Sequence, residues 1–571
     1  MLFVSTVKRR LLFLSIVFCT SNILMFLIFS KIFYSNNILI DFAVHPFNIC
    51  DKYPDLWKFI KISYVISFNG ATLIISNLIY SSIFLKQKII KNENTLINNI
   101  DNSELNLLAG KDENDNLVYI PEKGLYQNVL ITGTIGSGKT SSAMYPFTKQ
   151  LIGYKADNKK EKLGLLILDV KGNYHKQVAK YCNLYGREKD LMVLSLDGNI
   201  KYNPLDKPHL KAHILANRLK TILTLFSSKN GEQYWLDKAE QILTECIKLC
   251  RLYNNGYVTF VELHKLITIP DYYSSKIVYL RNLFLAGKLS KEDCFNLLSS
   301  IEFFEKEFLK LDSRTMAILK SEITRITGSF ISDYQIQKVF CPSKQEINFK
   351  GFRNLISQGK ILVLNMNLAE FKNLSKIIAA YLKLDFQTEV MSRLSHSKNN
   401  LFRSVAFISD EFHEYVTATD ADFFAQSREA KCINIVTTQS YTSLLNSLDN
   451  QNTTKTIIQN LVNKFWFRTD DIFTIEDAQK QLGKEEKTKI SKTISENAKT
   501  TNFNIITKKF NSLDSNLSES INSYSQFDFV YDTNFFTQKL ETFSALSFIS
   551  TGNSIVPPQK LKMIPYFKNI N

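Results

Sequence analysis

The sequence lacks a cysteine pattern that could staple its fold or bind a metal. Its eight cysteines are scattered over 571 residues, and no spacing among them suggests a disulfide framework or a Cys₄ site. Cys246 and Cys250 stand four positions apart in a helical pattern whose apolar face also carries Leu243 and Ile247, which favours core packing over metal binding. The sequence therefore predicts that most of the chain lies in a reducing compartment.

A zinc protease motif is absent as well. His413 and Glu414 stand together, but Thr417 occupies the position where the helical metalloprotease motif has its second histidine. We therefore expect His413 and Glu414 on the surface of a helix.

The charge of the chain is strongly of one sign. Its formal net charge is +16 and its pI is about 9.2, which favours contact with nucleic acid, another polyanion or anionic lipid. Codon bias can account for part of the basic excess, since Lys, Asn, Ile, Phe and Tyr are all abundant. With 571 residues, the chain far exceeds the roughly 250 to 300 at which one core stops growing, so two or more folded units are expected.

Two uncharged runs near the N-terminus have the length of membrane helices. Leu11–Ser30 has 20 residues and Ile62–Leu85 has 24, and at about 1.5 Å per residue each can cross a hydrocarbon core of about 30 Å. Basic residues precede the first run and follow the second: Lys8, Arg9, Arg10, Lys86, Lys88 and Lys91. By the positive-inside bias, this predicts that the N- and C-termini are both cytoplasmic. Residues 1–91 are thus predicted to be a two-pass anchor with transmembrane helices at about 11–30 and 62–85 and a short external loop at 31–61.

The alternative for the first run is a cleaved signal peptide. The run is long for the apolar region of such a peptide, and no small-residue cleavage site follows before Lys31.

Downstream, an alternation of strand and helix patterns predicts a parallel α/β sheet covered on both faces. Residues 92–120 are mostly polar and suit a linker or an irregular entry. Several of the later strand patterns are continuous apolar runs, as in doubly covered parallel sheets: Asn128–Ile131, Gly164–Leu168, Leu191–Leu196, Ile361–Asn365, Val405–Ile408, Ile433–Thr438 and Phe465–Phe467. Ligands of such folds gather at the carboxyl ends of the strands.

The alternation stops after Asn203-Pro204-Leu205 and resumes near Phe349. In between, the sequence indicates helices only, so we predict an all-α domain at 206–349, inserted into a nucleotide-binding domain of residues 121–205 and 350–571. Residues Glu485–Ser525 are rich in Ser, Thr, Asn and Lys with weak periodicity, which predicts a mobile or variable excursion. We detect no internal repeat.

A glycine-rich loop follows the first of these strands. It fits the phosphate-binding pattern of two glycines around four residues and then Lys and Ser/Thr, and its predicted nucleotide-binding residues are Gly133, Thr134, Gly136, Ser137, Gly138, Lys139 and Thr140. Lys139 would neutralise β/γ-phosphate oxygens of ATP, and the Thr140 hydroxyl would hold Mg²⁺. The alternative is a chance Gly/Ser/Thr turn, which the preceding strand and the following helical stretch disfavour.

Hydrolysis also needs carboxylates, and Asp410 and Glu411 end the apolar run that begins at Val405. Asp410 would accept from Mg²⁺-bound water, and Glu411 would polarise the attacking water. An ordinary helix cap is the alternative for such a pair. The 271 positions between Lys139 and Asp410 exceed what a compact nucleotide-binding core needs, as the predicted insertion explains.

Two more residues are candidates for catalysis in a ring motor. Arg428 could stabilise charge on the γ-phosphate of a neighbouring subunit, and Gln439, after the strand Ile433–Thr438, could report loss of that phosphate. The alternatives are a solvated helix arginine and a polar residue that merely ends a strand.

Taken in order, these features resemble the type IV coupling proteins, the membrane-anchored hexameric ATPases of bacterial conjugation and type IV secretion, in their TraD/TrwB-like branch. The resemblance covers nearly the whole chain. It is carried by the two membrane helices, Gly133–Thr140, Leu168–Gly172, Asn203–Leu205, the helical insertion, Asp410–Phe412, Ser427–Ala430, Thr438–Ser440 and Asp470–Gly483.

The resemblance implies a RecA-like P-loop motor domain with an inserted all-α domain facing the cytoplasm, at the bacterial inner membrane. It implies a homo-hexameric ring with a central channel that delivers relaxase-bound DNA, held without sequence preference, or effector proteins to a secretion channel. Lys139 and Thr140 correspond to the P-loop pair, Asp410 and Glu411 to the Walker B acids. Arg428 and Gln439 correspond to residues of the subunit interface, although Glu429-Ala430-Lys431 departs from the usual pattern after the arginine.

Two other functions compete with this one. An FtsK-like or HerA-like translocase of chromosomal or double-stranded DNA has a similar loop, but FtsK-type chains carry four membrane helices, a long linker and a winged-helix reader, for which we expect no room here. A membrane scaffold without turnover is disfavoured by the intact set of Lys139, Thr140, Asp410 and Glu411.

Overall fold

The chain divides into two compact units, Met1–Glu104 and Leu105–Asn571. In this computed structural model, the described residues are 104–568 with gaps at 170, 227–232, 270, 372, 396–402, 498–502, 505–508 and 511–515, together with 14–24, 27, 59, 62–63 and 66–76.

In the N-terminal unit, residues 14–24 and 66–76 are helical. The Asn22 Nδ2 group donates a hydrogen bond of 2.7 Å to Asn69 Oδ1, so the two helical segments contact each other. Among the described residues, no helix combines the length and the apolar composition needed to cross a membrane. The rest of the predicted membrane segments, 11–30 and 62–85, lies outside the described residues.

The larger unit is built on an 11-stranded sheet in the order β2-β1-β15-β14-β9-β3-β8-β7-β4-β6-β5. The seven strands from β9 to β5 are parallel, and they are the seven predicted from the sequence: β3 (Val129–Thr132), β4 (Gly164–Leu168), β5 (Leu191–Leu194), β6 (Ile361–Leu364), β7 (Val405–Ser409), β8 (Cys432–Thr438) and β9 (Asn463–Phe467). The predicted α/β class with a parallel sheet is therefore confirmed.

Both faces of the parallel strands are buried, as their apolar runs predicted. Along β4, Leu166 and Leu168 join one core cluster, whereas Leu165 and Ile167 join a second, because successive side chains of a strand point to opposite faces. Helices cover both faces: α5 (Glu122–Leu125), α6 (Tyr145–Gly153), α7 (Tyr174–Leu184), α15 (Phe352–Gln358), α16 (Leu368–Phe371), α17 (Asn373–Ser395), α18 (Asp420–Gln426), α19 (Tyr441–Leu448), α20 (Gln451–Asn460) and α21 (Ile472–Leu482).

Four antiparallel strands extend the sheet beyond β9. They are β1 (Asn106–Lys111), β2 (Leu117–Pro121), β14 (Ser544–Ser550) and β15 (Ile555–Lys562). The polar segment predicted as a linker at 92–120 therefore contributes two strands, because Leu105, Leu107 and Ala109 are buried at a spacing of two while the polar residues form the turn after them.

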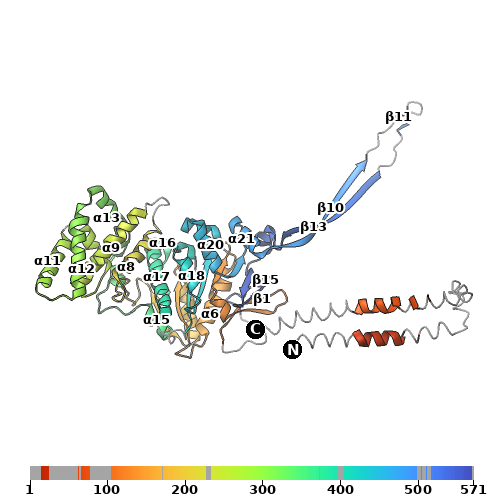
Figure 1. Cartoon of the computed structure of the whole chain (residues 1–571), viewed down its shortest axis with the longest axis horizontal. Helices are drawn as coiled ribbons and strands as arrows, with labels where there is room; N and C mark the ends of the chain where they lie inside the picture. The colour runs from red at the N-terminus through yellow and green to blue at the C-terminus, as the bar shows by residue number, and fades with distance from the viewer. Residues whose placement is uncertain are drawn as a thin grey trace, which may run out of the picture. The chain divides into compact units, whose positions relative to one another are not determined.

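The segment predicted as a mobile excursion, Glu485–Ser525, contains most of a two-stranded ribbon. β10 (Lys484–Asn497) pairs antiparallel with β13 (Asn516–Phe529) in unbroken register, and β11 (Phe503–Asn504) pairs with β12 (Lys509–Phe510) (Figure 1). Ile490 and Ile494 share one face, but the polar residues between them hide this alternation in the amino-acid composition.

Between β5 and β6 the described residues contain helices and no strands. They form α8 (Ala212–Leu223), α9 (Gln233–Tyr253), α10 (Phe260–Thr268), α11 (Tyr272–Leu285), α12 (Lys291–Glu302), α13 (Ser313–Thr327) and α14 (Tyr334–Phe340). Side chains of Thr259, Ser290, Asp312 and Asp333 accept from backbone N–H groups at the start of four of these helices. At the entry, Asn203 Oδ1 accepts from Leu205 N at 2.9 Å, which fixes the turn around Pro204.

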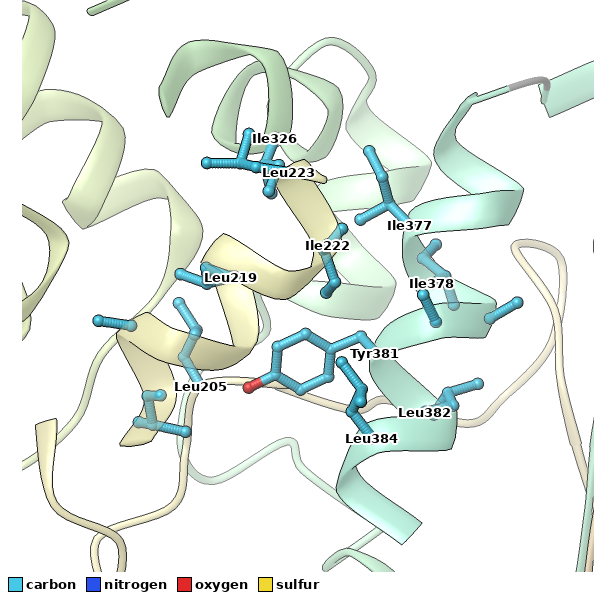
Figure 2. Packing of buried hydrophobic residues seen from close by; sticks show 14 of the residues in the cluster. Leu205, Leu219, Ile222, Leu223, Ile326, Ile377, Ile378, Tyr381, Leu382 and Leu384 are labelled. Carbon is cyan, nitrogen blue, oxygen red and sulfur yellow. The ribbon is translucent and has the colours of Figure 1, made fainter. Parts of the chain in front are cut away.

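Helix α17 joins this helical region to the sheet domain. Leu219, Ile222 and Leu223 of α8 lie beside Ile377, Ile378 and Tyr381 of α17 (Figure 2). Helix α17 also carries two buried charges that pair on its two sides. Toward the helical region, Asp385 pairs with Arg218 Nη1 at 2.9 Å and with Lys207 Nζ at 2.7 Å. Lys383 Nζ donates to Tyr415 O at 2.7 Å and pairs with Asp420 at 2.5 Å.

We expect Lys383→Met to lower the free energy of unfolding of the larger unit by roughly 3–5 kcal/mol, because it leaves the buried Asp420 carboxylate without its cation. The measurement is denaturant-induced unfolding followed by tryptophan fluorescence. The double variant Lys383→Met/Asp420→Leu should recover part of the stability. A single variant as stable as the wild type would contradict the assigned role of the pair.

Candidate functional site

The glycine-rich loop leaves the carboxyl end of β3 and is shaped by glycines that no other residue could replace without strain. Gly133, Gly136 and Gly138 have φ of 151°, 79° and 97°. A Cβ atom on Gly138 would lie 2.5 Å from the Phe543 ring, and one on Gly133 would lie 2.6 Å from Phe467 Cβ. The loop is therefore a tightly packed backbone turn of the kind whose N–H groups surround phosphates.

Lys139 lies at the end of this loop and is almost completely buried. Its Nζ donates to the carbonyl oxygens of Gly133 and, at 3.1 Å, Thr134. Burial lowers the pKa of Lys139, while the carboxylates of Glu411 and Asp410 act in the opposite direction. Thr140 follows at the start of the helical segment Thr140–Met144, which continues into α6, so the loop opens directly into a helix N-terminus that favours anions.

Asp410 and Glu411 follow β7, two strands away from β3 in the sheet. Asp410 Oδ1 accepts from Thr437 Oγ1 at 2.6 Å, and both carboxylates pair with Lys171 Nζ at 3.1 Å. Glu411 has φ 48°, a left-handed conformation that is costly for a residue with a side chain. The two acids are thus buried and held in a fixed, strained turn.

One carboxylate oxygen of Glu411 has no hydrogen-bond partner among the described residues. Glu411 Oε2 is buried and makes no hydrogen bond to any described residue, and His413 Nδ1 lies 3.7 Å from it. An unsatisfied buried carboxylate oxygen is costly and marks a position for a water or substrate hydroxyl. This arrangement fits the nucleotide and Mg²⁺ inferred from the sequence.

The residues available for a metal ion also fit that inference. No group of three or more His, Cys, Asp or Glu side chains in the described part of the chain could hold a metal alone. Mg²⁺ commonly takes one or two protein oxygens and completes its shell with phosphate and water. The Thr140 hydroxyl and the Asp410 carboxylate are oxygen donors of that kind.

The sequence led us to expect His413 and Glu414 on the surface of a helix, but they do not lie there. They belong to the short turn Phe412–Glu414, and only 13% of the His413 side chain is exposed. Burial lowers the pKa of His413 despite the nearby carboxylates of Glu411 and Glu414, which favours its neutral form. The prediction was wrong because the strained turn at Glu411 directs these residues back toward the site.

Lys171 is the residue of the site that the sequence did not identify. It follows β4 in the turn whose Asp169 side chain accepts from the backbone N–H groups of Lys171, Asn173 and Tyr174. Burial works to lower the pKa of Lys171, but the carboxylates of Asp410 and Glu411 outweigh it and raise that pKa. The lysine was visible in the turn, but its partners lie 239 positions away or more and become neighbours only through the pairing of β4 with β7.

The structure separates the last two candidates. The Gln439 carbonyl oxygen accepts from Gly133 N at 3.2 Å, so Gln439 borders the loop. Arg428 precedes β8 and is exposed at its opposite end. Seven strand residues, at about 3.3 Å each, separate it from that edge, so Arg428 does not reach the site of its own chain.

Comparison with known proteins gives one family and one fold. Residues 340–513 match the model of the type IV secretion-system coupling protein DNA-binding domain. Comparison with curated proteins gave no match.

Solved structures of the coupling protein TrwB share the fold at low sequence identity. The unbound TrwBΔN70 is 14% identical, with a TM-score of 0.51 over 78% of this chain and 87% of that chain. TrwB with ADP and Mg²⁺ is 14% identical, with a TM-score of 0.52 over 80% and 89%, and TrwB with the ATP analogue ADPNP is 13% identical, with a TM-score of 0.50 over 77% and 86%. The resemblance to the type IV coupling proteins is thus confirmed: residues 340–513 match the model of this family's DNA-binding domain, and the fold is similar to that of TrwB.

Proposed function

We propose that this protein is an ATP-hydrolysing coupling motor that passes DNA, effector proteins or both to a type IV secretion channel. The observation that carries the proposal is the meeting of a phosphate loop, with its buried lysine, and a buried acid pair at the same edge of a parallel sheet. The domain match at 340–513 supports a coupling protein rather than a chromosome translocase. The nucleotide complexes of TrwB support ATP and Mg²⁺ as its cofactors.

In the proposed reaction, Mg²⁺ would supply charge neutralisation between the phosphate oxygens and the protein. The N–H groups of the glycine loop would hold the phosphates, Lys139 would exchange its bonds to the loop carbonyl oxygens for the β/γ oxygens, and Thr140 and Asp410 would hold the ion. Glu411 Oε2 is the free oxygen that accepts a hydrogen bond from the attacking water and orients it. Lys171 holds both carboxylates in place before the cofactors bind.

Anchoring and assembly belong to the same proposal. Residues 1–91 anchor the motor in the bacterial inner membrane, with both termini in the cytoplasm, and a homo-hexamer receives relaxase-bound single-stranded DNA. The position of Arg428 supports a ring. Because this exposed arginine is remote from the phosphate loop of its own chain, the phosphate that it could contact is one bound at the loop of another chain.

We expect Lys139→Ala to abolish ATP hydrolysis and DNA transfer in a mating assay, because it removes the cation that meets the phosphates. Glu411→Gln should keep nucleotide binding but lower the hydrolysis rate by about 10²-fold or more, the usual contribution of a positioned base. Phosphate release and binding of a fluorescent ATP analogue separate the two effects. The matched control is Glu429→Gln, which makes the same carboxylate-to-carboxamide change at an exposed residue. Full hydrolysis by Glu411→Gln would contradict the assigned role.

A second expectation concerns Arg428. Arg428→Ala should bind nucleotide normally yet hydrolyse it slowly, and mixing it with Lys139→Ala subunits should restore part of the activity, because some interfaces then combine an intact Lys139 with an intact Arg428. Lys431→Ala is the control. If mixing restores no hydrolysis, Arg428 does not act across an interface.

A further inference from the structure

One buried lysine of the motor domain has no partner. Lys464 lies on β9, and only 3% of the residue is exposed. Its ammonium makes neither a hydrogen bond nor an ion pair with any described residue, and it lies over the Phe548 ring, 5.9 Å from the ring centre. Burial lowers the pKa of Lys464 to about 8, although the charge of Asp477 opposes this effect.

Two other buried lysines of the larger unit behave differently. Lys383 and Lys207 are as buried as Lys464, and each pairs with a carboxylate, at 2.5 Å and 2.7 Å. Buried cations are normally paired in this way, because transfer out of water is costly. Lys464 is therefore the exception among these three: no carboxylate forms a close ion pair with its ammonium, although the charge of Asp477 acts on it from the same groove. An anion that enters this groove could pair with it.

The ammonium faces a groove that could admit such an anion. The groove lies between α20 and α21, has a volume of about 420 Å³, and is lined by Lys455, Gln459, Asp477, Lys480 and Gln481 around Lys464. Three lysines against one aspartate leave a net positive charge. Lys455 and Lys480 are exposed at the rim. Burial raises the pKa of Asp477, and the charges of Lys464, Lys480 and Lys455 oppose this effect.

The lining also indicates what kind of anion fits. It consists of three lysines, one aspartate, amides and aliphatic side chains and contains no aromatic ring on which a base could stack. Lysine ammonium groups act as point charges on phosphates and carry no sequence preference. The groove falls within the residues that match the coupling-protein DNA-binding domain, on a chain of net charge +16.

The groove is separate from the nucleotide site. It lies at the entry end of β9, between the C-terminal halves of α20 and α21, whereas the phosphate loop follows the exit end of the parallel neighbour β3. An anion bound at Lys464 therefore does not compete with ATP phosphates.

We propose that the groove between α20 and α21 binds a backbone phosphate of the nucleic-acid strand, with Lys464 at its floor and Lys455 and Lys480 at its rim. This assignment rests on the proposed DNA motor function and locates a grip on the strand outside the ATPase centre.

The test uses the full-length protein in detergent micelles and a fluorescein-labelled single-stranded oligonucleotide. Lys464→Met and Lys455→Gln/Lys480→Gln should each weaken binding at every sequence, and removal of each lysine–phosphate pair should reduce the slope of log affinity against log salt by about 0.7. The rim variant changes exposed residues only, so it tests the groove even if Lys464→Met alters folding. Lys180→Gln/Lys189→Gln, two exposed lysines on α7 and before β5, make the matched charge control.

A footprint of lysine acylation, read by mass spectrometry, distinguishes the sources of phosphate. The oligonucleotide should protect Lys455 and Lys480, and inorganic phosphate at equal ionic strength should not. Protection by inorganic phosphate alone, or by an acidic peptide but not by the oligonucleotide, would overturn the assignment. Unchanged affinity and slope in both variants would overturn it and leave the motor function standing, whereas a wild-type protein that binds no DNA would remove both.

Discussion

The two opposite charges of α17 are the constraint on which the rest of the larger unit depends. Lys383 and Asp385 are two positions apart on a helix that turns about 100° per residue, so they point to nearly opposite sides of it. Lys383 is bound by the segment that directly follows Asp410 and Glu411, at Tyr415 and Asp420. Asp385 is bound by Lys207 and Arg218 at the border of the helical insertion. Neither side can move relative to α17 without exposing a buried charge.

This arrangement places the acid pair on a rigid support. Tyr415, whose carbonyl oxygen accepts from Lys383, also donates its hydroxyl to the Asp410 carbonyl oxygen at 3.1 Å. A chain of hydrogen bonds thus runs from α17 to the backbone of Asp410. The strained conformation of Glu411 persists because its neighbours on both sides are held in this way.

The sequence predicted the elements of the site better than their mutual geometry. Local patterns sufficed for the seven parallel strands, since continuous apolar runs and a glycine loop depend only on neighbouring residues. The pairing of Lys171 with Asp410 depends on strand order, which brings together residues 239 positions apart and is not written in any local pattern. The position of His413 depends on the strained turn at Glu411, and that of Arg428 on the direction of β8. The two strands at 106–121 were missed because a short buried alternation adjoins a strongly polar turn.

The position of β3 within the sheet has a consequence for biosynthesis. Both neighbours of this apolar strand come from far downstream: Val129 pairs with Ile435 of β8 and with Asn463 of β9. At about 5–20 residues per second, the ribosome needs roughly 15 to 60 s to supply even the first of them. Throughout that interval β3, apolar except for Thr132, is an unpaired strand beside a glycine turn, so the glycine loop is the first part of the proposed nucleotide site to be synthesised and among the last to become ordered.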